Sequence, residues 1–284
     1  MEYVILNNGV KMPLVGIGTF PYKGEELKEV LQICYDAGYR LIDTAWLYQN
    51  EVEIGDFLKA NKIQDVFVTS KLHFDQIYWY YNQHLRIGIR KSSIRRAYLG
   101  SQKRLALSQI DLYLLHAPFK NFKNLYTAIT KLYTEGMIKA VGVSNFSINN
   151  LEQLKECSDI VPAVNQIEMN PFNSNRSLID YCKSRGIVVE AFSPFGRGLL
   201  TKEIMDEPKL KELSRKYDKS VAQVILRWLT QQGIVAIPRS NKVEKIRPNI
   251  SIFDFNLTDV EIDEIYGINK NIRTVGGKIR VGHD

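Results

Sequence analysis

The sequence predicts an α/β fold of the (β/α)₈ (TIM) barrel type with an N-terminal β-hairpin. Three observations predict it: eight short apolar runs alternate with segments of helical periodicity, the runs are apolar almost throughout, and no G-x-G-x-x-G turn follows any of them. Nearly continuous apolar runs indicate strands buried on both faces, as in a parallel sheet. Eight such units in 284 residues favour a barrel over a doubly wound sheet, which commonly carries that glycine fingerprint.

The chain opens with a hairpin signal. Asn8-Gly9 stands between two apolar stretches, and this pair favours a type I′ turn, in which both central residues have positive φ. The eight barrel strands are then expected at 14–20, 40–45, 65–71, 109–118, 138–145, 162–169, 187–194 and 233–240.

Helical spacing fills the intervals between the strands. The residues that fall three or four positions apart, and so share one helix face, are Leu27, Val30, Leu31 and Cys34 within 25–37, then Leu151 and Leu154, then Leu178, Ile179 and Cys182. No linker rich in Pro, Gly or Ser divides the chain, so residues 1–284 are expected to form one domain.

The composition is that of a soluble globular protein, with 45% hydrophobic and 24% charged residues, which excludes disordered and collagen-like chains. No apolar window is long enough to span a membrane, and no basic segment precedes an apolar one at the N-terminus. Cys34, Cys157 and Cys182 form neither a CxxC motif nor a Cys/His cluster, so no disulfide framework and no metal site are expected. We expect a cytoplasmic protein without a membrane partner.

A basic stretch raises a second possibility for a partner. Seven Lys/Arg and no acid lie between Arg86 and Arg104, just after four aromatic residues at 78–81. This pattern is compatible with a nucleic-acid surface, but no nucleic-acid motif accompanies it. We therefore favour a solvated helix face and expect no nucleic-acid partner.

Polar residues at three consecutive strand ends define the candidate active site. The second predicted strand ends in Asp43 with Tyr48 five residues later, the third ends in Lys71, and the fourth ends in His116. In a (β/α)₈ barrel the loops that follow the strands converge at one face, where the chemistry takes place. These four side chains are therefore expected to lie together.

The four residue types suit proton transfer. A tyrosine hydroxyl has a pKa of about 10, and a neighbouring ammonium such as that of Lys71 lowers it by favouring the phenolate. Asp43 is the candidate counter-ion for the lysine, and His116 the candidate donor to a carbonyl oxygen. Taken singly, each has a structural alternative, such as helix capping for Asp43 or core packing for His116. Their occurrence together favours the functional interpretation.

Longer motifs point to a family. These are GYRLIDTAWLYQNEVEIG at 38–55, TSKL at 69–72, DLYLLHAP at 111–118, EGMIKAVGVSNF at 135–146, NQIEMNP at 165–171, EAFSPFGRG at 190–198 and VILRWLTQQGIVAIPRS at 224–240. In these segments and in their order, the chain resembles the aldo-keto reductases over nearly its full length. The resemblance implies NADP(H)-dependent reduction of aldehydes and ketones, with Asp43, Tyr48, Lys71 and His116 as the catalytic tetrad. Tyr48 would give the proton and the nicotinamide the hydride.

The same resemblance implies a set of cofactor contacts. Ser144, Asn145 and Gln166 match the groups that hold the carboxamide, and Phe192 takes the place of a stacking ring that is usually tyrosine. The remaining matches are Gly18, Thr19 and Asp43 near the nicotinamide, and Ser193, Phe195 and Arg197 in the loop over the pyrophosphate. The structural alternative makes Ser144-Asn145 a helix cap, Gln166 a polar filler and Phe192 a core residue.

The adenosine end departs from the family pattern. The expected contacts at this end are Arg239, Ser240, Lys245 and Asn249, and Pro248 stands where a glutamate is common, a loss for which Arg247 could compensate. Two cations and a hydroxyl suit a 2′-phosphate, although lysine lacks the stacking plane of arginine. NADPH is the expected cofactor, with NADH also possible.

The substrate pocket departs as well. His73 and Ala117 occupy places where members often carry tryptophan, so we expect a wider, less aromatic pocket lined by Phe20, Trp46, His73 and His116, with Trp79 a further candidate. The short tail after Asn269 resembles the diketogluconate-reductase-like branch and suggests small, polar carbonyl substrates. A monomer is expected, since no apolar stripe indicates an interface. The alternative is a noncatalytic nucleotide-binding barrel that acts as a regulatory or structural subunit.

Overall fold

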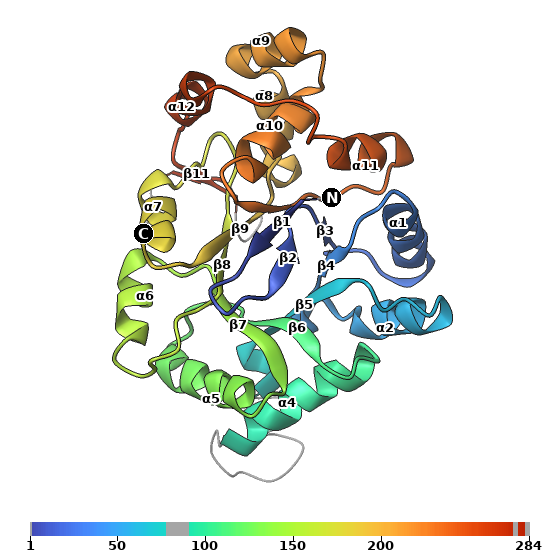
Figure 1. Ribbon diagram of the computed structural model, residues 1–284, viewed down its shortest axis with the longest axis vertical. Coiled ribbons are helices and arrows are strands. Elements are labelled where there is room, and N and C mark those ends of the chain that lie inside the picture. Colours follow the sequence, from blue (N-terminus) through green and yellow to red (C-terminus); the bar gives the residue numbers. More distant parts are fainter. Residues whose placement is uncertain (1, 78–90, 275–277, 282–284) are drawn as a thin grey trace.

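A barrel of parallel strands forms the centre of the molecule. The computed structural model describes residues 2–77, 91–274 and 278–281, and Figure 1 looks down on its barrel. One eight-stranded sheet has the order β10-β9-β8-β7-β6-β5-β4-β3, and a parallel bridge between Val15 and Ala236 joins its two edges. The strands are β3 (Ile17–Gly18), β4 (Leu41–Asp43), β5 (Phe67–Leu72), β6 (Ile110–Leu115), β7 (Ile138–Ser144), β8 (Val164–Glu168), β9 (Val188–Phe192) and β10 (Val235–Ile237). The predicted (β/α)₈ barrel is confirmed.

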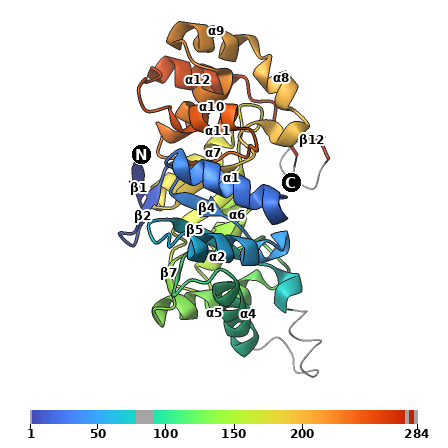
Figure 2. The ribbon, with the colours of Figure 1, turned by 90° about the vertical axis from the view of Figure 1, so that its right-hand side faces the viewer.

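Helices surround the barrel. Those between strands are α1 (Gly24–Asp36), η1 (Trp46–Tyr48), α2 (Glu51–Ala60), α4 (Lys91–Arg104), α5 (Phe122–Thr134), α6 (Ile148–Leu154) and α7 (Arg176–Ser184). After β9 come η2 (Gly196–Gly198), α8 (Thr201–Met205), α9 (Pro208–Tyr217) and α10 (Val221–Thr230), and after β10 come α11 (Val243–Ile250) and α12 (Asp259–Gly267). Figure 2 shows α9 stacked with α8, α10 and α12 at one end of the longest axis.

The helix faces follow the predicted periodicity. The α1 helix buries Leu27, Val30, Leu31 and Cys34 against the outside of the barrel. Side chains spaced by three or four residues in this way lie on one face, and their burial removes apolar surface from water. The same holds for α6 and α7, where Leu151, Leu154, Ile179 and Cys182 are buried.

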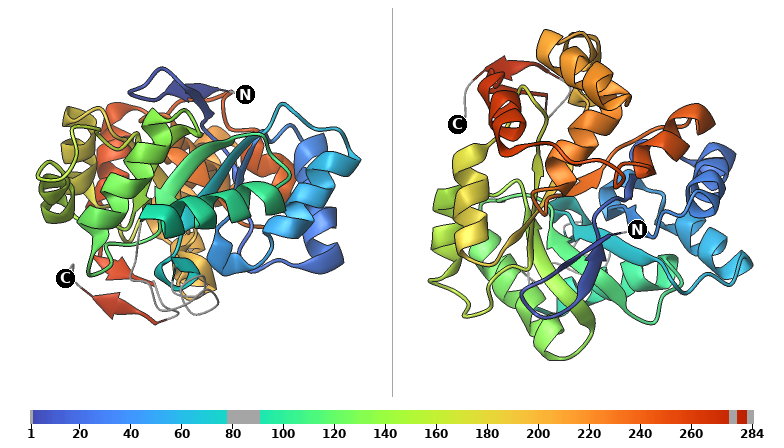
Figure 3. Two further views of the ribbon diagram at one scale, coloured as in Figure 1. Left: turned by 90° about the horizontal axis from the view of Figure 1, so that it is seen from below. Right: turned by 45° about the horizontal axis from the view of Figure 1, so that its top comes forward.

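The N-terminal hairpin closes one end of the barrel. Strands β1 (Tyr3–Ile5) and β2 (Lys11–Pro13) are antiparallel, and Leu6 and Met12 pack on Leu41, Phe67 and other barrel residues. Figure 3 shows this hairpin and the C-terminal strands β11 (Ile272–Arg273) and β12 (Arg280–Val281) on opposite ends of the barrel. The other end of the barrel is thus left for the site.

The type I′ turn predicted for this hairpin is wrong. Gly9 has a φ of 84°, but Asn8 is not among the residues with positive φ. The amide of Gly9 donates to the carbonyl of Leu6, and the amide of Leu6 donates to that of Val10. This is a three-residue loop with glycine in the left-handed position, so a single residue, Gly9, needs the freedom that glycine has.

Most strands are shorter than their apolar runs. The run at 233–240 pairs only over Val235–Ile237, because Pro238 has no amide hydrogen to extend the ladder. Lys71 is the penultimate residue of β5, and His116 follows β6 by one residue. These shifts leave the four candidate side chains at one end of the barrel.

Polar residues gather in the layer of the barrel interior at the carboxyl ends of the strands. Apolar side chains fill the layers toward the hairpin, among them Leu41, Phe67, Leu112, Ala140 and Val164. At inward-pointing positions two or four residues further along their strands come Asp43, Lys71, Gln166 and Glu190, all buried. The interior therefore changes from apolar to polar toward the carboxyl ends of the strands.

The basic stretch lies only in part among the described residues, since Arg86, Arg90 and the aromatic residues 78–81 fall outside them. Two arginines of α4 pair with acids from other elements, Arg95 with Glu135 and Arg104 with Glu51. These pairs reduce the net positive charge of the helix, which supports the interpretation as an ordinary helix surface.

The C-terminal tail is fastened to the barrel. The backbone amide and hydroxyl of Thr274 donate to the carboxylate of Glu168 at the end of β8, with distances between 2.6 and 3.0 Å.

None of the helices within the described ranges combines the length and the apolar character that a membrane span requires. Over the same ranges, no cluster of His, Cys, Asp or Glu has the composition of a metal site.

Candidate active site

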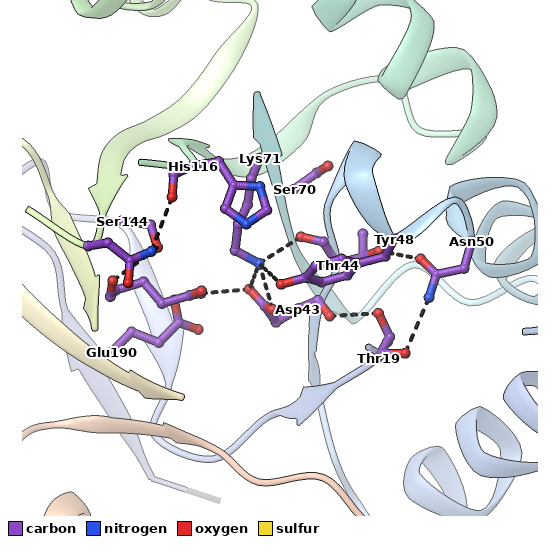
Figure 4. Close-up of polar contacts among 12 residues, drawn as sticks. Thr19, Asp43, Thr44, Tyr48, Asn50, Ser70, Lys71, His116, Ser144 and Glu190 are labelled. Carbon is purple, nitrogen blue, oxygen red and sulfur yellow. Dashed lines mark hydrogen bonds and ion pairs between the residues drawn. The ribbon is translucent and has the colours of Figure 1, made fainter. Parts of the chain in front are cut away.

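The ammonium of Lys71 is the centre of the candidate site. Its Nζ donates to both carboxylate oxygens of Asp43 at 2.7 Å, to the carbonyl of Thr44 at 2.9 Å and to the hydroxyl of Tyr48 at 3.4 Å (Figure 4). Lys71 is fully buried and Asp43 almost so. Burial acts to lower the pKa of Lys71, but Asp43 and Tyr48 outweigh it and raise that pKa, so the ammonium stays charged.

Asp43 is held from two sides. Besides the lysine, the Gln166 amide donates to Asp43 Oδ2 at 2.7 Å. Burial raises the pKa of Asp43, and the ammonium and both hydrogen bonds oppose that shift. The pair resists separation because either charge alone would be buried without compensation.

Tyr48 reaches the site from a short helix. The η1 turn begins directly after Asp43-Thr44-Ala45 and directs the phenol back over Lys71, where the ammonium lies 5.0 Å from the ring centroid. The expectation that Lys71 lowers the pKa of Tyr48 holds for the contribution of the ammonium, but the net shift of this pKa is upward. Burial raises this pKa, and the charge of Lys71 only offsets part of the rise, because removing a phenolate from water costs more than one nearby cation returns. Tyr48 is therefore a protonated hydroxyl, which suits a proton donor.

His116 is a neutral ring at the same site. Its imidazole meets Tyr48 edge-on with ring centroids 5.9 Å apart. Burial, followed by the charge of Lys71, lowers the pKa of His116 to about 3. Its Nδ1 is buried without a hydrogen-bond partner among the described residues. A neutral imidazole keeps one N–H, which can donate to a substrate oxygen.

Aromatic rings form the wall around Tyr48. Phe20 lies 5.1 Å from Tyr48, and His73 stacks on Trp46 and lies edge-on to His116 with centroids 5.4 Å apart. The four predicted pocket residues are thus one connected group, while Trp79 lies outside the described residues. Phe119 packs edge-on against His73 at 5.1 Å. No motif in the sequence singled out Phe119, so the wall is more aromatic than positions 73 and 117 imply.

The carboxamide candidates lie together on the neighbouring strand ends. Asn145 has a φ of 62°, and its side-chain amide donates to the His116 carbonyl at 3.2 Å and to the Ser144 hydroxyl at 3.0 Å. The Ser144 hydroxyl donates to the carbonyl of Gln166. Asn145 Oδ1 is buried with no hydrogen-bond partner in the part of the chain that the structure describes. Such an orphaned acceptor is costly unless a ligand donor occupies it, and a carboxamide N–H₂ is a suitable donor.

Backbone and ring surfaces complete this side of the site. Thr19 is buried and bonds the carbonyl of Asp43 through its hydroxyl, and a Cβ on Gly18 would lie only 3.4 Å from the Ile237 carbonyl. Phe192 is partly exposed at the end of β9 and packs on the interior cluster, so its ring offers a surface for stacking.

The loop after β9 folds back toward Phe20. Ser193 and Arg197 both have positive φ, 53° and 57°. Thr201 donates to the carbonyl of Phe195 at 2.6 Å and accepts from the Gly198 amide, which fixes the loop. The Arg197 guanidinium lies 5.6 Å from the Phe20 ring centroid. The structure thus brings this loop cation to the rim of the site.

The adenosine candidates are distributed along the chain after β10. Arg239 and Lys245 are exposed, Ser240 is partly buried, and Asn249 is buried in α11. The Arg239 guanidinium lies 5.9 Å from the Tyr22 ring centroid. Pro248 lies within the last turn of α11. Exposed cations and a hydroxyl are groups that can hold a phosphate.

Sequence reasoning gave no role to two buried polar residues of the site. Asn50 donates to the carbonyls of Thr19 and Tyr22 and accepts from the Thr44 hydroxyl, which ties the loop after β3 to the loop after β4 (Figure 4). Glu190 accepts from the Gln166 amide at 2.8 Å. The available signal for Glu190 was an acid within the apolar run of β9.

Comparison with known proteins agrees with this architecture. The model of the "Aldo/keto reductase family" matches residues 14–270. A glyoxal reductase of Bacillus subtilis (strain 168) is 40% identical over 276 residues, covering 96% of this chain and 94% of the relative. A morphine 6-dehydrogenase of Pseudomonas putida is 37% identical over 282 residues, covering 94% and 91%.

Solved structures give the same answer. The crystal structure of a Bombyx mori aldo-keto reductase in complex with NADP superposes with a TM-score of 0.85 at 33% identity, covering 96% of this chain and 94% of that chain. Barrel and site together define an oxidoreductase that acts on aldehydes and ketones. The chain belongs to the aldo/keto reductase family.

Proposed function

We propose that this protein reduces small, oxygen-rich aldehydes and ketones to alcohols with NADPH, and that Tyr48 is the general acid. One observation carries the proposal: a buried ammonium, Lys71, contacts Asp43 and the Tyr48 hydroxyl beside a neutral His116. The alternative, a noncatalytic nucleotide-binding barrel, is not favoured because all four groups are present and in contact range.

Each residue of the site has its own role in the proposed reaction. When bound, the cofactor supplies a hydride to the carbonyl carbon. Tyr48 gives its hydroxyl proton to the carbonyl oxygen, and the N–H of His116 holds that oxygen in position. The Lys71 ammonium stabilises the phenolate that remains on Tyr48, and Asp43 fixes the ammonium. One hydride and one proton convert the carbonyl to an alcohol.

The cofactor residues suit NADPH. Asn145 Oδ1, which is buried without a partner among the described residues, is the acceptor for the carboxamide, Ser144 and Gln166 lie beside it, and Phe192 offers the stacking surface. The similarity to a reductase solved with NADP supports the same assignment. NADH remains a second possible cofactor, because Pro248 replaces a carboxylate expected at the adenosine end.

His73 favours substrates with a second oxygen. The Asp75 backbone amide donates to His73 Nδ1 at 3.2 Å, so a neutral His73 carries its proton on Nε2. Burial lowers the pKa of His73, which keeps the ring neutral. A second N–H donor near His116 suits dicarbonyls, hydroxyaldehydes and keto sugars. The similarity to a glyoxal reductase supports this class, since glyoxal has two adjacent carbonyls.

A substrate panel tests the function. We expect NADPH consumption with dicarbonyls, hydroxyaldehydes and keto sugars, and lower kcat/KM with apolar aldehydes of similar size. The variant His73→Phe keeps an aromatic ring but removes the second N–H donor, and it should lower kcat/KM for dicarbonyls by about 2- to 10-fold, the effect of one neutral hydrogen bond, while apolar aldehydes are less affected. NADPH binding without turnover of any member would contradict the reductase proposal.

Lys245→Ala tests the adenosine end. Loss of one charge-assisted hydrogen bond should weaken NADPH binding by about 10- to 100-fold. NADH lacks the 2′-phosphate, so its dissociation constant should stay the same. Fluorescence titration with both cofactors measures the two constants, and Lys211→Ala on the outer helix α9 is the control. Equal weakening of both cofactors would show that Lys245 does not contact the 2′-phosphate.

Four finer points stay predictions from the sequence: one domain over residues 1–284, a monomer, a cytoplasmic location and the absence of a nucleic-acid partner.

A further inference from the structure

Glu190 is a buried acid that the proposed reaction does not use. It lies inside the barrel on β9 with no exposed surface, in register with Gln166 on β8 and Val235 on β10. Phe192, the proposed stacking ring, lies two residues further along and so on the same face of the strand. Glu190 therefore lies in the layer directly beneath the proposed nicotinamide site.

Among the described residues, no cation is bonded to Glu190. The amide nitrogen of Gln166 donates to Asp43 Oδ2 at 2.7 Å and to Glu190 Oε2 at 2.8 Å, which uses both of its hydrogens. The donors of Lys71 go to Asp43, Thr44 and Tyr48. Glu190 Oε1 is buried with no hydrogen-bond partner among the residues that the structure describes. Within the described part of the chain, the two acids thus share one amide, and only Asp43 has a bonded counter-ion.

This arrangement favours the neutral form of Glu190. A fully buried carboxylate with one neutral donor is less stable than the protonated acid, since its hydration is lost and not replaced. Burial raises the pKa of Glu190 to about 8; the charge of Asp43 adds to the rise, while Gln166 and Lys71 oppose it. At neutral pH the free protein therefore holds a proton on Glu190.

We propose that Glu190 senses the redox state of the cofactor: it keeps its proton in the free protein and beside NADPH, and releases it when NADP⁺ binds. The inference rests on the proposed function. The nicotinamide ring of NADP⁺ carries a positive charge that NADPH lacks. Facing Glu190 are Asp43 on β4, Lys71 on β5, Gln166 on β8 and the apolar Val235 on β10, which gives one cation for two acids. The cationic ring supplies the missing counter-charge, so Glu190 helps to set the preference for oxidised or reduced cofactor.

The sign of the pH dependence follows by linkage. Binding of NADP⁺ releases the Glu190 proton, so its affinity increases as the pH rises toward about 8 and levels off above, where free Glu190 is already ionised. Binding of NADPH releases no proton from this group. At pH values below about 8, the ratio of the dissociation constants, NADP⁺ over NADPH, should therefore fall by up to about tenfold for each pH unit by which the pH rises. The 2′-phosphate is common to both cofactors, and its titration cancels in the ratio.

Fluorescence titration of both cofactors measures this ratio. The titrations run from about pH 6 to about pH 9.5, a range that extends at least about one pH unit to each side of the expected change. In Glu190→Gln the ratio should be independent of pH, because the amide keeps the shape and an acceptor for Gln166 but cannot ionise. The matched control is Glu168→Gln, a buried carboxyl on β8 that bonds the tail residue Thr274 and should keep the wild-type slope.

A second measurement needs no variant. Mixing the wild-type protein with NADP⁺ in weak buffer should release up to about one proton per site near pH 7, read with an indicator dye, and NADPH should release none beyond the phosphate contribution. A pH-independent ratio in the wild type, an equal slope in Glu190→Gln, or no proton release would each overturn the role of Glu190 while leaving NADPH-dependent turnover intact. Failure of both cofactors to bind would contradict the proposed function as well.

Discussion

Replacing Tyr48 by phenylalanine is expected to lower kcat for carbonyl reduction by about 10²- to 10⁴-fold, the usual contribution of general acid catalysis. The phenol hydroxyl is the transferable proton, and phenylalanine retains the ring that packs against Phe20 and His116. Cofactor binding should be unchanged, because none of the proposed cofactor contacts uses this hydroxyl. Steady-state rates and fluorescence titration of NADPH measure the two effects separately.

Tyr217→Phe is the control for the Tyr48 variant. This tyrosine lies on the outer helix α9, where its hydroxyl bonds Glu261. The control should keep wild-type turnover. If Tyr48→Phe reduced carbonyls at a comparable rate, Tyr48 would not be the acid, and another donor at the site would have to be sought.

Replacing Lys71 by methionine is expected to destabilise the protein by about 3–5 kcal/mol, the cost of leaving one partner of a buried ion pair unpaired. Lys71 and Asp43 are both buried, and the methionine fills a similar volume without the charge. The free energy of unfolding in urea measures the loss. Activity should also be lost, because the Tyr48 phenolate would have no stabilising cation.

The destabilisation should depend on pH with a definite sign. Burial already raises the pKa of Asp43 with Lys71 present, and without the ammonium it rises further. A folded-state pKa above the unfolded value means that the folded variant binds the proton more tightly, so its stability falls as the pH rises above the unfolded value. We expect a larger loss at pH 8 than at about pH 5, where Asp43 can take up a proton more easily.

A double variant separates the charge from the packing. Adding Asp43→Asn to Lys71→Met removes the unpaired carboxylate and should restore much of the stability, but not the activity. Lys123→Met, which breaks the exposed pair with Glu156, should change stability little. A double variant no more stable than Lys71→Met would show that packing, and not the buried charge, determines the loss.

Sequence periodicity determined the barrel and the identity of the four central side chains. Burial on both faces makes the parallel strands apolar throughout, and this pattern is visible without coordinates. Asp43, Lys71 and His116 stood out because each interrupts or ends such a run. The positions of the strand ends were less well determined. An apolar residue such as Leu72 can point into the barrel or out of it, and the residue type is apolar in both cases.

Only the tertiary structure decided the electrostatics of the site. A contact between Lys71 and Tyr48, here 3.4 Å, was expected from the sequence. The net rise of the Tyr48 pKa was not, because it comes from burial, which is a property of the whole fold. The state of Glu190 depends on the pairing of β8 with β9, which places Gln166 beside it, and on the absence of a bonded cation among its described contacts. The sequence by itself determined which residues line the barrel, because strand period and residue type are local. Which charges are compensated was decided by the packing of strands far apart in the chain, because the cost of a charge depends on everything that surrounds it.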